Sequence, residues 1–108
     1  MDIPPAIIDG DTIRLGSEVI RLSNIDAPEM GWRAECDAER FLAEASKDRM
    51  EVILAAPGEL QIDREGTDFY GRTLARIRVS GVDVGELLIE AHLAVPWAGQ
   101  RHDWCGPG

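Results

Sequence analysis

Short apolar runs alternate with turn-forming residues over the first quarter of the chain, and this pattern restricts the segment to β-structure. The apolar runs are residues 7–8, 12–15 and 19–22, and the turns between them are residues 9–11 and 16–17. Asp and Gly at such positions favour tight turns between antiparallel strands. We therefore expect a three-stranded meander at the start of the fold.

The spacing of apolar residues changes at Asp37. From there, apolar side chains recur at intervals of three and four residues, as on one face of an amphipathic helix: Ala38, Phe41, Leu42 and Ala45. A second, shorter helix is predicted after Asp83, because Glu86 follows three residues later as in a capping box. The apolar stripe of this second helix is Val84, Leu87, Leu88 and Ala91.

Strand patterns occupy much of the remaining sequence. Residues 52–54 and 60–62 bracket a Pro-Gly turn and predict two strands, whereas residues 63–71 predict a polar loop. Residues 72–79 alternate apolar side chains with arginines, which predicts a strand with one apolar and one basic face. The tail from Val95 is expected to be irregular. About five strands and two helices indicate one small α+β domain over residues 1–108, built on a β-barrel.

Composition and charge limit the classes of function. The chain has 108 residues, 44% hydrophobic and 29% charged, which is typical of one compact soluble domain. Its apolar runs are too short to span a membrane, so no membrane partner is expected. The formal net charge of −9 argues against a protein that binds nucleic acid or anionic membranes by non-specific attraction.

Two cysteines, Cys36 and Cys105, are too few for a disulfide-built scaffold and lack the spacing of a zinc site. Spacing alone allows either two independent thiols or one disulfide that closes most of the chain. We predict that they pair, because the tail needs an anchor after the second helix. A disulfide implies an oxidising compartment. We therefore expect an extracytoplasmic location with a leader removed from this chain, and a cytoplasmic location is the alternative.

Four carboxylates lie at two predicted turns: Asp9, Asp11, Asp26 and Glu29. Each turn Asp alone is explained by hydrogen bonds to its own backbone. Arg21 lies in an otherwise apolar strand and needs an anionic partner, and Arg72 begins a later strand. A salt bridge to one of the four carboxylates explains Arg21, and a solvated strand end explains Arg72. The combination is more specific than its parts.

Three short motifs occur in order along the chain: IDGDT at 8–12, RL at 21–22 followed by IDAPE at 25–29, and DFYGR at 68–72. In sequence and spacing they resemble the motifs of the staphylococcal nuclease (thermonuclease-like) family. The resemblance extends over nearly the whole chain and implies a five-stranded OB-fold barrel with two accessory helices. It also implies calcium-dependent hydrolysis of phosphodiester bonds in DNA and RNA.

The resemblance also implies a metal site. Asp11 and Asp26 match the metal-binding carboxylates, and Ala27 matches a position whose backbone carbonyl binds the ion, where the family usually has threonine. Asp9 matches a position that supports the water shell of the metal. Two carboxylates, a carbonyl and waters suit a hard ion such as Ca²⁺. Four carboxylates against two arginines would repel a phosphodiester, and a divalent cation brings the sum near zero.

The same resemblance assigns catalytic and substrate-binding residues. Glu29 matches the general base, Arg21 and Arg72 match two phosphate-binding arginines, and Tyr70 matches a substrate-phosphate contact. The base-flanking tyrosines of the family have no clear equivalent past Val95. Trp97 is the candidate stacking residue there, with aromatic cover for the barrel as the alternative role.

Several features depart from the family. The chain is acidic where the secreted enzyme is basic, and it lacks that enzyme's longer C-terminal helix. His92 and His102 have no matching partners and are left out of the site, and Trp104 is a more distant stacking candidate than Trp97.

The expected function is a monomeric calcium-dependent nuclease that acts on exposed or single-stranded DNA or RNA. The alternatives are a non-catalytic OB-fold module that binds nucleic acid or protein, and a calcium-stabilised protein-interaction domain. The site residues favour the nuclease, and the acidic surface favours the alternatives.

Overall fold

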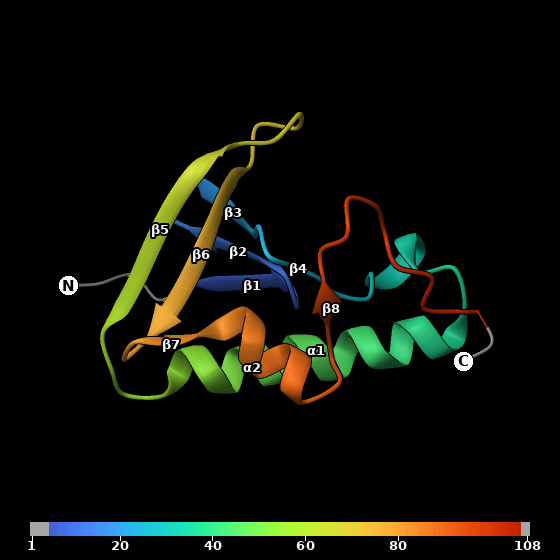
Figure 1. The fold of residues 1–108 in the computed structure, drawn as a ribbon. Helices are drawn as coiled ribbons and strands as arrows, with labels where there is room; N and C mark the ends of the chain where they lie inside the picture. The colour runs from blue at the N-terminus through green and yellow to red at the C-terminus, as the bar shows by residue number, and fades with distance from the viewer. Residues whose placement is uncertain (1–4, 107–108) are drawn as a thin grey trace.

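The computed structural model describes residues 5–106, in which a mixed β-sheet packs against two helices (Figure 1). Five strands follow one another in the order β1-β2-β3-β6-β5, and a short strand β7 pairs with β6. The bounds are β1 Ala6–Asp9, β2 Thr12–Leu15, β3 Glu18–Leu22, β5 Leu60–Thr67, β6 Thr73–Val79 and β7 Val82–Asp83. This arrangement confirms the predicted α+β domain of OB-like architecture.

The predicted N-terminal meander is confirmed. Strands β1, β2 and β3 pair antiparallel, and β3 then joins β6 in parallel. Opposite Ile13 on β2 lies Ile20 on β3, and both side chains are buried in the core. The neighbouring register pair, Thr12 and Arg21, belongs to the other face of the strands. The pleat therefore separates the core from the residues of the candidate site.

The first helix, α1, spans Asp37–Ala55 and is longer than predicted. The strand predicted at residues 52–54 is wrong, because these residues form the last turn of α1. Short apolar runs fit a strand or a buried helix turn equally well. Here Ile53 and Leu54 pack against the core from the helix, and the chain leaves the helix before Pro57.

The predicted apolar face of α1 is wrong for Ala38 and Phe41, whereas Leu42 and Ala45 are partly buried. Phe41 is 79% exposed and Ala38 is exposed, whereas the buried residues of the helix are Glu39, Ala43, Ser46 and Met50. The β1–β2 turn sets this orientation: a Cβ on Gly10 would lie 1.9 Å from the Ser46 Oγ atom and 3.2 Å from the Ala27 Cβ atom. Because Gly10 has no side chain, the turn can press against α1 at Ser46.

The polar loop predicted at residues 63–71 is wrong for residues 63–67, which continue β5. Ion pairs with β6 explain the polar sequence of this strand. Asp63 pairs with Arg78, and Glu65 lies 3.6 Å from the guanidinium of Arg76. The loop itself is confined to the residues between Thr67 and Thr73.

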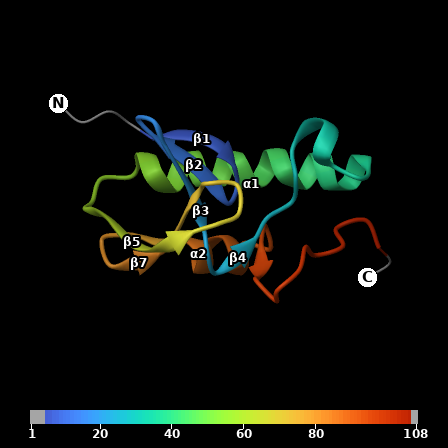
Figure 2. The same cartoon turned by 90° about the horizontal axis from the view of Figure 1, so that it is seen from above.

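The second helix, α2, spans Val84–Glu90 and begins as predicted. Asp83 precedes it, and its side chain accepts a 3.1 Å hydrogen bond from the Glu86 N–H. Helix α1 packs against β1, and α2 packs against β6 and β7 (Figure 2). Neither described helix has an apolar stretch that could cross a bilayer. The buried core is Ile13, Ile20, Leu22, Ile25, Met50, Ala75, Ile77, Val84, Leu88 and Ala94.

The C-terminal segment returns to the start of α1. Its first residues form β8 (Val95–Pro96), which pairs with β4 (Ile25–Asp26), and the rest of the described tail is irregular as predicted. The tail and the short 3-10 turn η1 (Gly31–Arg33) both lie at the N-terminal end of α1 (Figure 1). A disulfide joins Cys36 to Cys105 with a Cα–Cα distance of 6.1 Å, which confirms the predicted pairing.

We expect the Cys36→Ser, Cys105→Ser double variant to lose about 4 kcal/mol of unfolding free energy, because the disulfide closes a long loop and restricts the unfolded chain. The two cysteines are 69 residues apart. Urea denaturation of the variant and of the oxidised parent measures the difference. Reduction of the parent should reproduce it, and an unchanged midpoint after complete reduction would contradict a stabilising role.

Candidate active site

The β1–β2 turn places two buried carboxylates, Asp9 and Asp11, beside the loop that follows β4. Asp9 is 5% exposed and Asp11 is 6% exposed. The Asp11 Oδ2 atom accepts a 3.1 Å hydrogen bond from the Ala27 N–H, and Oδ1 accepts a 2.9 Å bond from the Thr12 hydroxyl. Asp11 therefore fixes the peptide of Ala27 at the edge of the acidic cluster.

Arg21 lies between two of the carboxylates. Its Nη2 atom is 3.5 Å from Asp11 Oδ2 and 3.6 Å from Asp26 Oδ1. Its Nη1 atom donates to the backbone carbonyls of Leu22 and Ile25. The salt-bridge interpretation of Arg21 is therefore confirmed, and Arg21 also borders a surface pocket.

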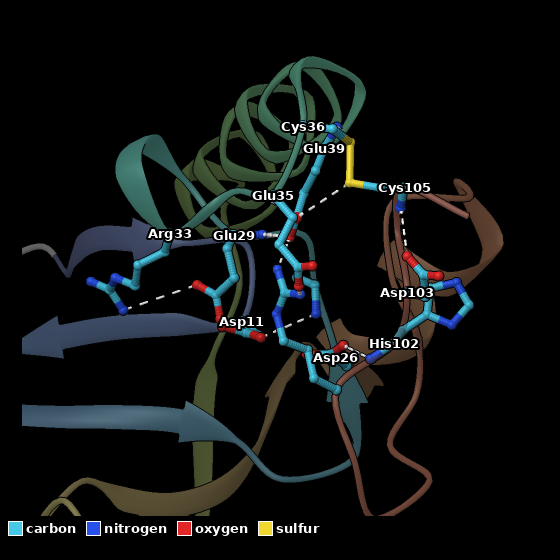
Figure 3. Close-up of polar contacts among 12 residues, drawn as sticks. Asp11, Asp26, Glu29, Arg33, Glu35, Cys36, Glu39, His102, Asp103 and Cys105 are labelled. Carbon is cyan, nitrogen blue, oxygen red and sulfur yellow. Dashed lines mark hydrogen bonds and ion pairs between the residues drawn. A yellow bond between two sulfur atoms is a disulfide. The ribbon is translucent and has the colours of Figure 1, made fainter. Parts of the chain in front are cut away.

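Asp26 is 3% exposed and is contacted by the C-terminal tail. The backbone N–H of His102 in the tail donates a 2.8 Å hydrogen bond to Asp26 Oδ2 (Figure 3). Burial raises the pKa of Asp26, and the nearby charge of Asp11 adds to the increase. The backbone of His102 thus enters the cluster, although its ring packs edge-on against Trp104 instead.

Glu29 follows at the edge of the cluster and is partly exposed. Its Oε2 atom lies 4.0 Å from Arg33 Nη1, and in Figure 3 its carboxylate lies beside Asp11. Burial raises the pKa of Glu29, with further increases from the charges of Asp11 and Asp9. Burial raises the pKa of Asp9 as well, again with a contribution from Asp11. The cluster therefore holds more negative charge than its arginines balance.

Arg72 reaches the site from the loop between β5 and β6. Asp68 orients it by accepting a 2.7 Å bond from Arg72 Nε and a 2.9 Å bond from its backbone N–H. Burial alone would raise the pKa of Asp68, but these hydrogen bonds outweigh it and lower the pKa. The Tyr70 ring lies 5.6 Å from the Arg72 guanidinium, within the range of a cation–π contact.

Two pockets that share lining residues lie at the candidate site, and Asp9, Asp11 and Asp26 are not among the residues that line them. One, of about 270 Å³, is lined by Arg21, Tyr70, Arg72 and Trp97 among others. The other, of about 640 Å³, includes Glu29 in its lining and shares Tyr70 and Arg72 with the first. The structure thus brings Arg21, Glu29 and Arg72 to one continuous surface, with Tyr70 between the two pockets and Trp97 at one end.

A buried carboxylate that the sequence did not single out supports this surface. Glu39 of α1 is fully buried, and its Oε2 atom accepts a 2.8 Å hydrogen bond from the Glu29 N–H. Its Oε1 atom accepts a 2.9 Å bond from the Glu35 N–H, which lies beside it in Figure 3. Arg101 of the tail forms an ion pair with Glu39 Oε2. These partners outweigh burial and lower the pKa of Glu39. An acidic residue in a first helical turn is ordinarily explained by the helix dipole, so its sequence carried no signal of this role.

Comparison with known proteins identifies the family of this chain. A family model described as staphylococcal nuclease homologue matches residues 19–103. The chain belongs to this family. The matched range begins after Asp9 and Asp11, and the structure places Asp11 within salt-bridge distance of Arg21 inside it.

Several curated relatives are similar over most of this chain. It is 34% identical over 94 residues to the succinoglycan biosynthesis protein ExoI of Rhizobium meliloti (strain 1021), covering 83% of this chain and 49% of that protein. It is 33% identical over 92 residues to endonuclease YncB of Bacillus subtilis (strain 168), covering 81% of this chain and 43% of the relative. Endonuclease YhcR of the same organism is 37% identical over 97 residues, 78% of this chain but 8% of the relative. The chain thus spans half or less of the length of these relatives.

The negative charge of Asp9, Asp11, Asp26 and Glu29 exceeds the charge of the nearby arginines. We therefore predict that Asp9→Asn stabilises the protein at pH 7, measured with a chelator present so that no metal ion is bound. The raised pKa of Asp9 means that its ionised form is disfavoured in the folded state. We expect a gain on the order of 1 kcal/mol, near the lower end of the cost of an unsatisfied buried polar group. The gain should disappear as the pH falls through the folded-state pKa, where Asp9 itself becomes neutral.

Asp68→Asn is the matched control, because the pKa of Asp68 is lowered and its ionised form supports folding above its unfolded-state pKa. This variant should be less stable than the parent at pH 7. Thermal melts at several pH values measure both effects, and an Asp9→Asn variant that melts below the parent at pH 7 would contradict the analysis.

Proposed function

We propose that this domain is a nuclease that hydrolyses phosphodiester bonds in exposed or single-stranded DNA or RNA with the help of a bound calcium ion. The observation that carries the proposal is the continuous surface on which Arg21, Glu29 and Arg72 line two adjoining pockets. Family membership and the relatives named endonucleases support it. The disulfide supports an oxidising compartment as the setting.

The residues of the cluster fit a hard divalent cation by their chemistry. Asp11 and Asp26 are buried carboxylates, and Ala27 is buried beside them with its N–H bonded to Asp11, so the two carboxylates and the Ala27 carbonyl are the candidate ligands. Burial is the main cause of the raised pKa values of Asp9, Asp26 and Glu29, and repulsion from neighbouring carboxylates adds to it, so a nearby cation would stabilise their ionised forms. Among residues 5–106, no three His, Cys, Asp or Glu side chains are close enough to complete a metal site alone. Water and a substrate phosphate would have to supply the remaining ligands.

Each side chain of the proposed active site has a separate role in hydrolysis. Glu29 accepts a proton from a water molecule as that water attacks phosphorus in line with the leaving oxygen. The new P–O bond forms as the bond to the leaving oxygen breaks, and the leaving oxygen takes up a proton from solvent. Arg21 and Arg72 donate hydrogen bonds to the phosphoryl oxygens on which negative charge accumulates. Bound calcium would neutralise a further phosphoryl oxygen.

Substrate contact falls to the aromatic residues of the same surface. Tyr70 stands beside Arg72 and between the two pockets, where a hydroxyl can reach a phosphate. Trp97 is 45% exposed, and its ring lies 5.3 Å from the Arg21 guanidinium. A base stacked on Trp97 would place its phosphate near Arg21. Stacking requires an unpaired base, which favours single-stranded substrates.

We expect Glu29→Gln and Arg72→Ala each to lower kcat on the order of 10² to 10³-fold, as does loss of one transition-state donor in other enzymes. Glu29→Gln should leave nucleotide affinity nearly unchanged, because the base acts on the chemical step. Cleavage of a single-stranded oligonucleotide with calcium measures both effects. Arg76→Ala is the control, because Arg76 is exposed on β6 and pairs with Glu65 away from both pockets. Wild-type rates in both site variants would refute the roles given to Glu29 and Arg72, and binding without any cleavage by the parent would identify a non-catalytic module.

Calcium should stabilise the folded protein, because a ligand that binds the native state alone adds about 2.7 kcal/mol at 100 times its Kd. Thermal melts with millimolar calcium, with and without a nucleotide, measure this shift. Asp11→Asn or Asp26→Asn should abolish it, whereas Asp48→Asn on the exposed face of α1 should not. A melting temperature of the parent that calcium leaves unmoved under both conditions would rule out the metal site.

A further inference from the structure

The aromatic side chains of this protein are placed on its surface and not in its core. The chain has three Trp, one Tyr and two Phe, yet the buried apolar side chains among residues 5–106 include none of them. Four of the six line the two pockets of the candidate site: Trp32, Phe69, Tyr70 and Trp97. Trp32 is 90% exposed and Phe69 is 98% exposed. Exposed apolar groups gathered in one area indicate a binding surface.

Arginines accompany three of these rings. The guanidinium of Arg33 lies 5.7 Å from the centre of the Trp32 ring, a spacing close to those of the Arg21–Trp97 and Arg72–Tyr70 pairs. Ring faces interleaved with cations are what single-stranded nucleic acid needs, since bases stack on the rings while phosphates contact the arginines.

Trp32 and Trp97 line different pockets of the candidate site. Trp97 belongs to the smaller pocket and Trp32 to the larger, and Tyr70 and Arg72 belong to both. Glu29 lines the pocket of Trp32, and Arg33 lies 4.0 Å from the Glu29 carboxylate. A strand that passes over Arg72 can therefore place one base at Trp97 and another at Trp32.

We propose that Trp32 and Arg33 form a second nucleotide subsite, in which Trp32 stacks on a base beyond the scissile phosphate on the Glu29 side and Arg33 contacts the adjacent phosphate. The position of the scissile phosphate rests on the proposed nuclease function. The ligand is single-stranded, because the face of a paired base inside a duplex is covered by its neighbours. A protein partner at Trp32 is the competing occupant, and the Arg33 guanidinium beside the exposed Trp32 ring favours the nucleic acid, which needs a stacking face and a phosphate contact together.

Binding is measured in the Glu29→Gln background with calcium, so that the substrate is not cleaved. Fluorescence anisotropy gives the Kd for labelled oligothymidines of two and eight nucleotides. Trp32→Ala should weaken binding of the octamer about 10- to 100-fold, equivalent to about 1.4 to 2.8 kcal/mol, and leave the dimer within about twofold. Trp32→Phe should retain most of the affinity. Arg33→Ala should reduce the slope of log Kd against log salt by about 0.7.

Phe41→Ala is the matched control, because Phe41 is also an exposed aromatic residue but lies on α1 and lines neither pocket. The subsite is overturned if Trp32→Ala binds the octamer as tightly as its parent, or if Phe41→Ala weakens binding equally. The first outcome would assign Trp32 to a protein contact. Cleavage by the wild-type protein tests the proposed function separately, since a protein that binds through Trp32 without cleaving retains the subsite and loses the nuclease.

Discussion

The buried carboxylate of Glu39 joins three segments that must meet for the candidate site to exist. A charge removed from water costs several kcal/mol unless hydrogen bonds and an opposite charge replace the lost hydration. Glu39 receives the N–H groups of Glu29 and Glu35 and the guanidinium of Arg101. These donors come from the loop after β4, the approach to α1, and the tail. Because Glu39 is satisfied only when all three are in place, its burial fixes the backbone of Glu29 against the helix.

The disulfide makes this arrangement less costly. Cys36 immediately precedes α1, its Sγ atom accepts a 3.4 Å hydrogen bond from the Glu39 N–H, and its bond to Cys105 holds the tail nearby. Ordering a free tail to bring Arg101 to Glu39 would cost conformational entropy for each residue fixed. With Cys105 attached, much of that loss is already incurred in the unfolded chain. The same attachment keeps the His102 N–H on Asp26, so scaffold and acidic cluster share one covalent anchor.

Local signals allowed much of the fold to be predicted, and long-range pairing explains the errors. The β1–β2 turn and the Asp83 cap of α2 are specified by neighbouring residues, and both predictions are confirmed. The site motifs are visible in the sequence because the residues of each lie within nine consecutive positions. The partnership of Glu39 with Arg101 spans 62 positions and leaves no local pattern. The true face of α1 depends on the approach of Gly10, which helical periodicity does not report. Trp32 lies in a short turn, where the spacing of apolar residues does not show whether a side chain is exposed or buried.

The buried carboxylates of this protein are of two kinds, which differ in the direction of their pKa shifts. Glu39 has a structural role, whereas the others belong to the candidate active site. The pKa of Glu39 is lowered because its donors exceed the cost of burial. The pKa values of Asp9, Asp26 and Glu29 are raised because burial and mutual repulsion exceed the support of Arg21 and Arg33. The cation proposed for this cluster would supply the positive charge that these three carboxylates lack. The neighbouring Glu39 shows that this fold can satisfy a buried carboxylate completely, and the deficit at the other three is therefore specific to the site.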